Sequence, residues 1–192
     1  MPWLALPYDE RKMKAALSDR FGVSGIPSLI VLDADLNVVN DDSVGSVRAD
    51  KTDGKSTGAN FPWKPPLVPT LDEATGFINE TPTFVVLADG VKDAAAREAV
   101  LAALTTAAQK AADAAKGGAA KIRYTIAGPD SDIAARVRSL TKLGDPSATP
   151  DFAMLDLENG KYFTQAGYEA SETAVASSTE DFIAGKLAML QL

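Results

Sequence analysis

Apolar residues near the start of the chain recur at helical spacing. They run from Met13 to Phe21, after Asp9 as a suitable N-cap and before Gly22 as a stop signal. Residues three and four apart share one side of a helix, so this pattern predicts an amphipathic helix over 9–21.

The next segment has the pattern of a β-hairpin. An apolar run over 28–32 is entered through Pro27 and is followed by a polar turn over 33–37. Proline is tolerated at the first residue of a buried strand because its missing N–H lies at the end of the ladder. The return strand is predicted from the valines at 38, 39, 44 and 47.

A change in composition separates the two halves of the chain. A polar stretch over 50–60 is followed by a proline-dense stretch over 61–69, a pattern typical of an extended inter-domain connection. We therefore place a proline-rich linker at 64–70, between a first domain over 1–63 and a second over 71–192.

The second half alternates short apolar runs with longer helical patterns. The order is β-α-β-α-β-β-α, which predicts an α/β fold with a mixed sheet and helices on both faces. Gly117-Gly118 ends the long helix, and Ser178 with Asp181 is the expected start of the last one. The predicted elements are strand 84–88, helix 93–116, strand 122–126, helix 132–143, strand 152–156, strand 161–164 and a final helix.

A short pattern is repeated in the two halves. Ile26-Pro27 stands six residues before Asp33, and Thr149-Pro150 stands six residues before Asp156. Each segment enters a strand through proline and leaves it through an Asp-led turn. A trans proline that simply opens a strand explains either site alone, but the repetition favours a cis bond at both.

Composition removes several kinds of chemistry. The 192 residues contain no cysteine and no histidine. Disulfide exchange needs a thiolate, Ser-His-Asp relays need an imidazole, and the usual zinc sites need one or the other. We expect no catalytic dithiol in this chain, no metal site and no cofactor.

Charge and hydropathy exclude two classes of partner. The net charge is −7 and the basic residues are scattered, which argues against nucleic-acid binding. The alanine-rich stretch over 94–116 is interrupted by charges, so we expect no membrane span. The first residues lack the basic and apolar regions of a signal peptide, which predicts a cytoplasmic protein.

Three segments of the first half carry a family resemblance. Residues 1–8, 20–29 and 60–63 resemble the thioredoxin-like domain of nucleoredoxin and tryparedoxin. The remainder, from Leu71 on, resembles nucleoredoxin's C-terminal thioredoxin-like domain. The resemblance implies a thioredoxin-like fold in two units: one incomplete, because its dithiol segment would precede Met1, and one complete.

The resemblance also implies roles for the two proline segments. The family's middle domain carries Trp-Cys-Pro-Pro-Cys and reduces protein disulfides, while a cis-proline loop facing the dithiol offers backbone to the substrate. By resemblance, Ile26 and Pro27 occupy that loop, and Thr149 and Pro150 are their equivalents in the second domain. Residues 89–93 stand where the second domain would carry a dithiol, which makes that domain redox-silent.

Three hypotheses follow for function. The first is a nucleoredoxin-like chain that is inactive alone and binds protein partners or disulfide substrates through the proline loop and the C-terminal domain. The second is that the chain is a fragment of a working protein-disulfide reductase, and the third is a non-catalytic thioredoxin-fold adaptor. An uncovered half sheet would also favour self-association. The resemblance extends the expected location to the nucleus.

Two competing motifs fail on required positions. The turn over 33–37 resembles the start of an EF-hand loop, but Val38 stands where glycine is required. The segment 54–57 resembles the end of a P-loop, but Ala49 stands where its first glycine belongs. Both are interpreted as polar loops, and Trp3 and Trp63 are expected to pack at the edge of the domain.

Overall fold

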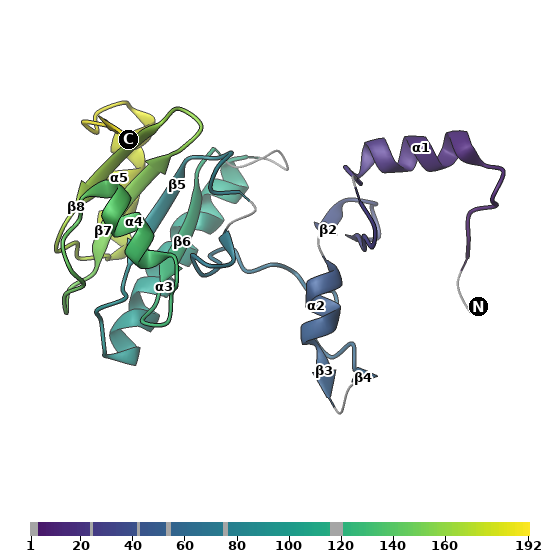
Figure 1. The fold of residues 1–192 in the computed structure, drawn as a ribbon, viewed down its shortest axis with the longest axis horizontal. Helices are drawn as coiled ribbons and strands as arrows, with labels where there is room; N and C mark the ends of the chain where they lie inside the picture. The colour runs from purple at the N-terminus through teal and green to yellow at the C-terminus, as the bar shows by residue number, and fades with distance from the viewer. Residues whose placement is uncertain (1–3, 24, 42, 53–54, 75–76, 116–120) are drawn as a thin grey trace. The chain divides into compact units, whose positions relative to one another are not determined.

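The structure is a computed structural model that describes residues 4–23, 25–41, 43–52, 55–74, 77–115 and 121–192. Its internal contacts divide the chain into unit 1 (Met1–Pro65) and unit 2 (Pro66–Leu192), shown in Figure 1.

Unit 1 contains two helices and two short antiparallel strand pairs. The helix predicted over 9–21 is confirmed, although it begins at Arg11 because Glu10, and not Asp9, takes the N-cap position. Gly22 ends it with φ +64°, and the Val23 amide donates to the Ser18 carbonyl at 2.8 Å, which is a Schellman motif. The elements are α1 (Arg11–Arg20), β1 (Val31–Leu32), β2 (Val38–Asn40), α2 (Ser43–Ala49), β3 (Lys51–Thr52) and β4 (Lys55–Ser56).

The predicted hairpin is present but shorter than expected. β1 pairs antiparallel with β2 across a turn in which the Asp33 carboxylate accepts hydrogen bonds from Asp35 and Asn37. The Asn37 side chain, ahead of the backbone amides, lowers the pKa of Asp33. Val44 and Val47 do not extend the return strand. They lie in α2, because a spacing of three residues also places them on one side of a helix.

The polar stretch predicted to be extended is folded. β3 pairs antiparallel with β4, and the residues that follow return to Asp50. The Asp50 carboxylate accepts from the Thr57 hydroxyl at 2.8 Å and from the Asn60 amide at 3.2 Å. These bonds hold the end of unit 1 together, so the extended interpretation of this stretch was wrong.

Part of the predicted linker over 64–70 packs into unit 2. Val68 is buried, and the carbonyl of Pro69 accepts from the Thr125 hydroxyl at 2.9 Å. Thr70 forms a parallel bridge with Ile126. The end of this segment therefore lies along the edge of the sheet of unit 2.

Unit 2 has the predicted element order, with one short strand added at its end. The five-stranded sheet has the order β6-β5-β7-β8-β9, in which β5 pairs parallel with β6 and antiparallel with β7. The elements are β5 (Thr83–Leu87), α3 (Ala94–Ala114), β6 (Arg123–Ala127), α4 (Ala134–Thr141), β7 (Asp151–Asp156), β8 (Lys161–Gln165), α5 (Glu172–Ile183) and β9 (Leu190–Gln191).

Helices cover both faces of this sheet, as predicted (Figure 1). On one face, α3 and α5 pack over aromatic residues, including Phe84 and Phe152, whose ring centroids lie 4.1 Å apart. On the other face, Val137 of α4 packs against Val85 and Ala153. Because β5 and β7 are buried on both faces, their central residues, 84–87 and 152–155, form continuous apolar runs.

Two predictions about helix ends have different outcomes. Asp93 caps α3 by accepting from the Ala95 amide, whereas the predicted stop at Gly117-Gly118 lies outside the described residues. The last helix begins at Ser171, which accepts from the Ala174 amide, and not at Ser178. Ser178 lies inside α5, and its hydroxyl shares a hydrogen bond with Tyr168.

Candidate functional site

The proline loop of unit 1 is open to solvent. Ile26 is 97% exposed and Pro27 is also exposed. The peptide bond between them is cis. The Ser28 hydroxyl donates to the Gly25 carbonyl at 2.7 Å and closes the loop locally. Burial of this apolar side chain against another molecule would remove it from water, which is favourable.

A hydrogen-bonded cluster around Asp50 forms the other end of unit 1. The Trp63 indole donates to the Asp50 carboxylate at 2.9 Å, and the Trp63 carbonyl accepts from the Asn40 side chain. The bond from Trp63, followed by that from Thr57, holds the pKa of Asp50 below its ordinary value. Trp63 thus packs within the unit, as predicted, whereas Trp3 lies outside the described residues.

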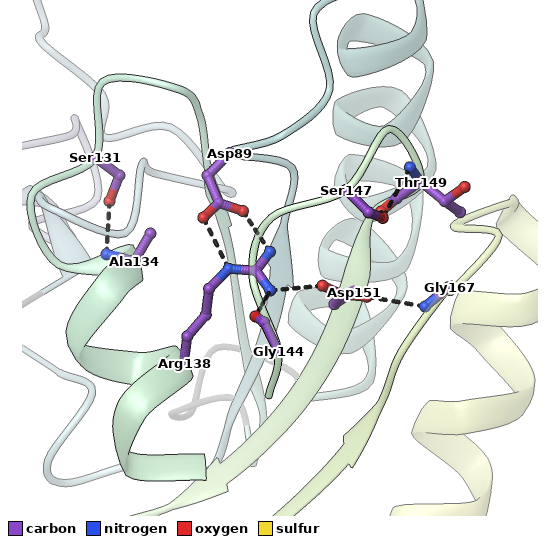
Figure 2. Close-up of polar contacts among 9 residues, drawn as sticks. All are labelled: Asp89, Ser131, Ala134, Arg138, Gly144, Ser147, Thr149, Asp151 and Gly167. Carbon is purple, nitrogen blue, oxygen red and sulfur yellow. Dashed lines mark hydrogen bonds and ion pairs between the residues drawn. The ribbon is translucent and has the colours of Figure 1, made fainter. Parts of the chain in front are cut away.

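In unit 2, Arg138 and two aspartates form an ion cluster at the start of segment 89–93, where the resemblance leads us to expect the position of a dithiol (Figure 2). The Arg138 guanidinium donates to both oxygens of Asp89, from Nε at 2.8 Å and from Nη2 at 2.6 Å. Its Nη1 donates to Asp151 at 2.7 Å and to the Gly144 carbonyl at 2.9 Å. The second Asp151 oxygen accepts from the Gly167 amide at 2.8 Å.

The fold explains why these three side chains meet. Asp89 follows β5, Asp151 begins the neighbouring strand β7, and Arg138 projects from α4, which covers that end of the sheet. Arg138 and Asp151 are each only 5% exposed. The hydrogen bonds to Asp89 and, to a smaller extent, to Asp151 raise the pKa of Arg138, so the guanidinium remains charged. Its bonds to both carboxylates compensate for the burial of their charges.

The loops on either side of the cluster touch backbone to backbone. A Cβ added at Gly90 would lie 2.2 Å from the Ser147 carbonyl oxygen, so only glycine fits there. The Pro150 carbonyl accepts from the Tyr168 amide at 2.7 Å, and Ser147 is bonded to Thr149 (Figure 2). The backbone of Thr149 and Pro150 is therefore already hydrogen-bonded within the domain.

The two predicted proline segments thus differ. Ile26 and Pro27 form an exposed loop, whereas Thr149 and Pro150 lie beside the buried cluster. The cis bond predicted at Thr149-Pro150 is absent, since the cis bonds of the described residues are Ile26-Pro27 and Phe61-Pro62. The Thr149 amide donates to the Ser147 hydroxyl, and the Pro150 carbonyl accepts from the Tyr168 amide, so this segment is fixed by bonds to the rest of unit 2.

The Arg138 cluster was not predicted from the sequence. Its members are far apart along the chain, and each alone resembles an ordinary surface charge. One signal was available: Asp89 and Asp151 lie next to continuous apolar runs, where a charged residue needs a buried partner.

Within the part of the chain that the structure describes, no three acidic, histidine or cysteine side chains are grouped so that they could hold a metal ion. None of its helices is both long enough and apolar enough to cross a bilayer.

Comparison with known proteins identifies the family. No protein-family model matches the sequence. Over 190 residues the chain is 33% identical to nucleoredoxin from Xenopus laevis, a match that covers 97% of this chain and 44% of that protein. Over 63 residues it is 41% identical to tryparedoxin from Trypanosoma brucei brucei, a match that covers 33% of this chain and 41% of that protein.

The chain belongs to the nucleoredoxin-like thioredoxin-fold proteins. It spans less than half the length of the curated relatives it matches. Among solved structures, it is similar to the bb fragment of ERp72, with a TM-score of 0.43 and 16% identity over 90% of this chain and 74% of that one. The family predicted from the residues is confirmed. This member of a redox family contains no cysteine.

Proposed function

We propose that this nucleoredoxin-like chain binds protein substrates of thiol–disulfide exchange through its Ile26-Pro27 loop and supplies no redox-active group itself. The observation that carries the proposal is the exposed Ile26 in a unit whose motifs resemble tryparedoxin. Substrate disulfides would be reduced by a dithiol segment outside this sequence, because exchange requires a thiolate and the chain has none.

Unit 2 has a different role in this proposal. Its equivalent of the redox site is filled by Arg138 and its two carboxylates, and Gly90 closes against Ser147. The Thr149 amide and carbonyl are already hydrogen-bonded to the Ser147 hydroxyl, so a substrate strand would have to compete with these bonds. Unit 2 therefore acts as a redox-silent domain that positions partners. A cytoplasmic or nuclear location is part of the same proposal.

The loop is tested by photo-crosslinking in the full chain. Benzoylphenylalanine placed at Ile26 should capture reduced, carboxymethylated insulin B chain, an extended peptide that cannot form disulfides. The control places the same group at Tyr8, which is aromatic and 86% exposed in the same unit. Several times more capture at Ile26 supports the proposal, and equal capture at both positions overturns it.

A second candidate function is a non-catalytic adaptor. The closed site in unit 2 favours it, since that domain needs no redox partner to be complete. The two functions are separated by measuring, through fluorescence anisotropy, how the same labelled peptide binds to the full chain and to an Ile26→Asp variant, which adds charge at the loop without disturbing a buried contact. Unchanged affinity of this variant for the peptide would favour the adaptor, and lost binding favours the substrate loop.

A further inference from the structure

A groove lies between helices α3 and α5 of unit 2, which cover the same face of the sheet. It consists of two hollows, of about 310 and 430 Å³, that share residues of both helices and of β6. Small-molecule sites have volumes of about 300–1,000 Å³, so each hollow is large enough to hold a small ligand. The α3–α5 groove therefore qualifies as a binding site by size.

Small side chains create the space in this groove. Ala107, Ala111 and Ala114 are spaced four and three residues apart, so they lie on one side of α3. Ala176 lines the groove from α5. One turn before these alanines, the larger side chain of Leu104 is fully buried. Because a methyl group extends less far than a leucine side chain, the two helices leave an apolar hollow where the alanines follow.

A hydroxyl group in the groove has unused hydrogen-bonding capacity. Tyr124 of β6 lines both hollows, and its Oη lies 3.1 Å from the Thr179 Oγ1. The Thr179 hydroxyl donates to the Val175 carbonyl at 2.7 Å, so Tyr124 supplies the proton of the shared bond. Burial raises the pKa of Tyr124, which keeps that proton in place. Among the described residues no group donates to Tyr124 Oη, so this oxygen can accept a hydrogen bond from a ligand.

The rim of the first hollow carries a net negative charge. Lys110 and Glu172 pair across the two helices at 3.1 Å, so their charges balance. Glu180 is exposed on the same rim, and the ion pairs of the described residues do not include it. Lys121 lines only the second hollow. A cation in the first hollow would therefore lie beside an unpaired carboxylate, and the net charge of −7 adds to the attraction.

We propose that the first hollow binds small aromatic amines, with the ring against the alanines, a ring N–H donating to Tyr124 and the ammonium group beside Glu180. An aromatic ring supplies the apolar surface that the alanine methyl groups can bury. Tryptamine combines a flat ring, a ring N–H and an ammonium group, which makes it a suitable probe. The inference concerns unit 2 and does not depend on the proposed function.

Titration of the ¹⁵N-labelled full chain with tryptamine, followed by the NMR shifts of its amides, tests the proposal. We expect saturable shifts in α3 and α5 around the groove. Indole-3-acetate has the same ring and the opposite charge, so it should bind at least about threefold more weakly. Absence of saturable shifts with tryptamine, or equal affinity for the two compounds, overturns the proposal.

The hydrogen bond to Tyr124 is tested with 1-methyltryptamine, which lacks the ring N–H. In the wild-type chain it should bind about twofold to tenfold more weakly than tryptamine, which is the net effect of one hydrogen bond. Tyr124→Phe should weaken tryptamine binding by a similar factor and remove the difference between the two ligands. A general disturbance of the fold would instead weaken both. If the difference persists in Tyr124→Phe, the ring does not bind to Tyr124 and the proposal is wrong.

Two matched pairs of variants locate the ligand. Glu180→Gln should weaken tryptamine binding by about twofold to fivefold, whereas Glu98→Gln, at an exposed position of α3 outside the groove, should leave it unchanged. Ala111→Leu fills the hollow and should abolish binding, whereas Ala99→Leu, also exposed and outside the groove, should not. If the members of either pair bind tryptamine equally well, the ligand lies elsewhere and the proposal is wrong.

Discussion

The guanidinium of Arg138 forms two hydrogen bonds with the carboxylate of Asp89, at 2.8 and 2.6 Å. The same guanidinium reaches Asp151, on the neighbouring strand. One side chain thus joins the end of β5, the start of β7 and helix α4 without any covalent link. The stability of unit 2 should depend on it.

Removal of the guanidinium tests that dependence. Arg138→Met leaves two buried carboxylates without a counterion and should destabilise unit 2 by about 3–5 kcal/mol, as measured by urea unfolding. Arg138→Lys keeps the positive charge but cannot form the bidentate hydrogen bonds, so its free energy of unfolding should lie between those of Arg138→Met and wild type. Arg136→Met, an exposed change on the same helix, is the control and should have little effect. Equal stability of all four proteins would show that the cluster does not hold unit 2 together.

The close approach of Gly90 to Ser147 gives a second prediction. Gly90→Ala places a methyl group 2.2 Å from a backbone oxygen, so the two loops must separate. We expect a loss of about 1–3 kcal/mol in the free energy of unfolding. Gly128→Ala is the matched control, because no atom lies within 4 Å of the added carbon. Similar losses in both variants would mean that the contact between the loops does not matter.

Acid should release Trp63 from Asp50. The hydrogen bonds to Asp50 lower its pKa in the folded state, so they stabilise unit 1 above the ordinary pKa of aspartate. That contribution is lost as the pH falls through the lowered value. In a Trp3→Phe background, Trp63 fluorescence should change below the ordinary aspartate pKa, and Asp50→Asn should remove this change. A transition that persists in Asp50→Asn would assign it to another group.

Much of unit 2 could be predicted because its signals are local. The buried strands at 84–88 and 152–156 are continuous apolar runs, and the Asp93 cap lies next to the helix it begins. Ser171 and Ser178 show where local signals end. Both are serines followed by acidic residues. Ser171 caps α5 by accepting from the Ala174 amide, whereas Ser178 lies inside the helix and its hydroxyl shares a hydrogen bond with that of Tyr168, ten residues away.

The Arg138 cluster could not be predicted for a related reason. Asp89 and Arg138 are 49 residues apart, and their pairing depends on how α4 crosses the sheet. The Ile26-Pro27 loop could be located from the sequence because residues 20–29, which contain it, resemble the family.

Insulin reduction tests whether this chain supplies a redox-active group. Turbidity is followed with dithiothreitol for the chain alone, for buffer, and for tryparedoxin from Trypanosoma brucei as the positive control. We predict that the chain alone precipitates insulin no faster than buffer, because exchange requires a thiolate and the chain contains no cysteine. Turnover by the chain alone above the buffer rate would contradict the proposed function.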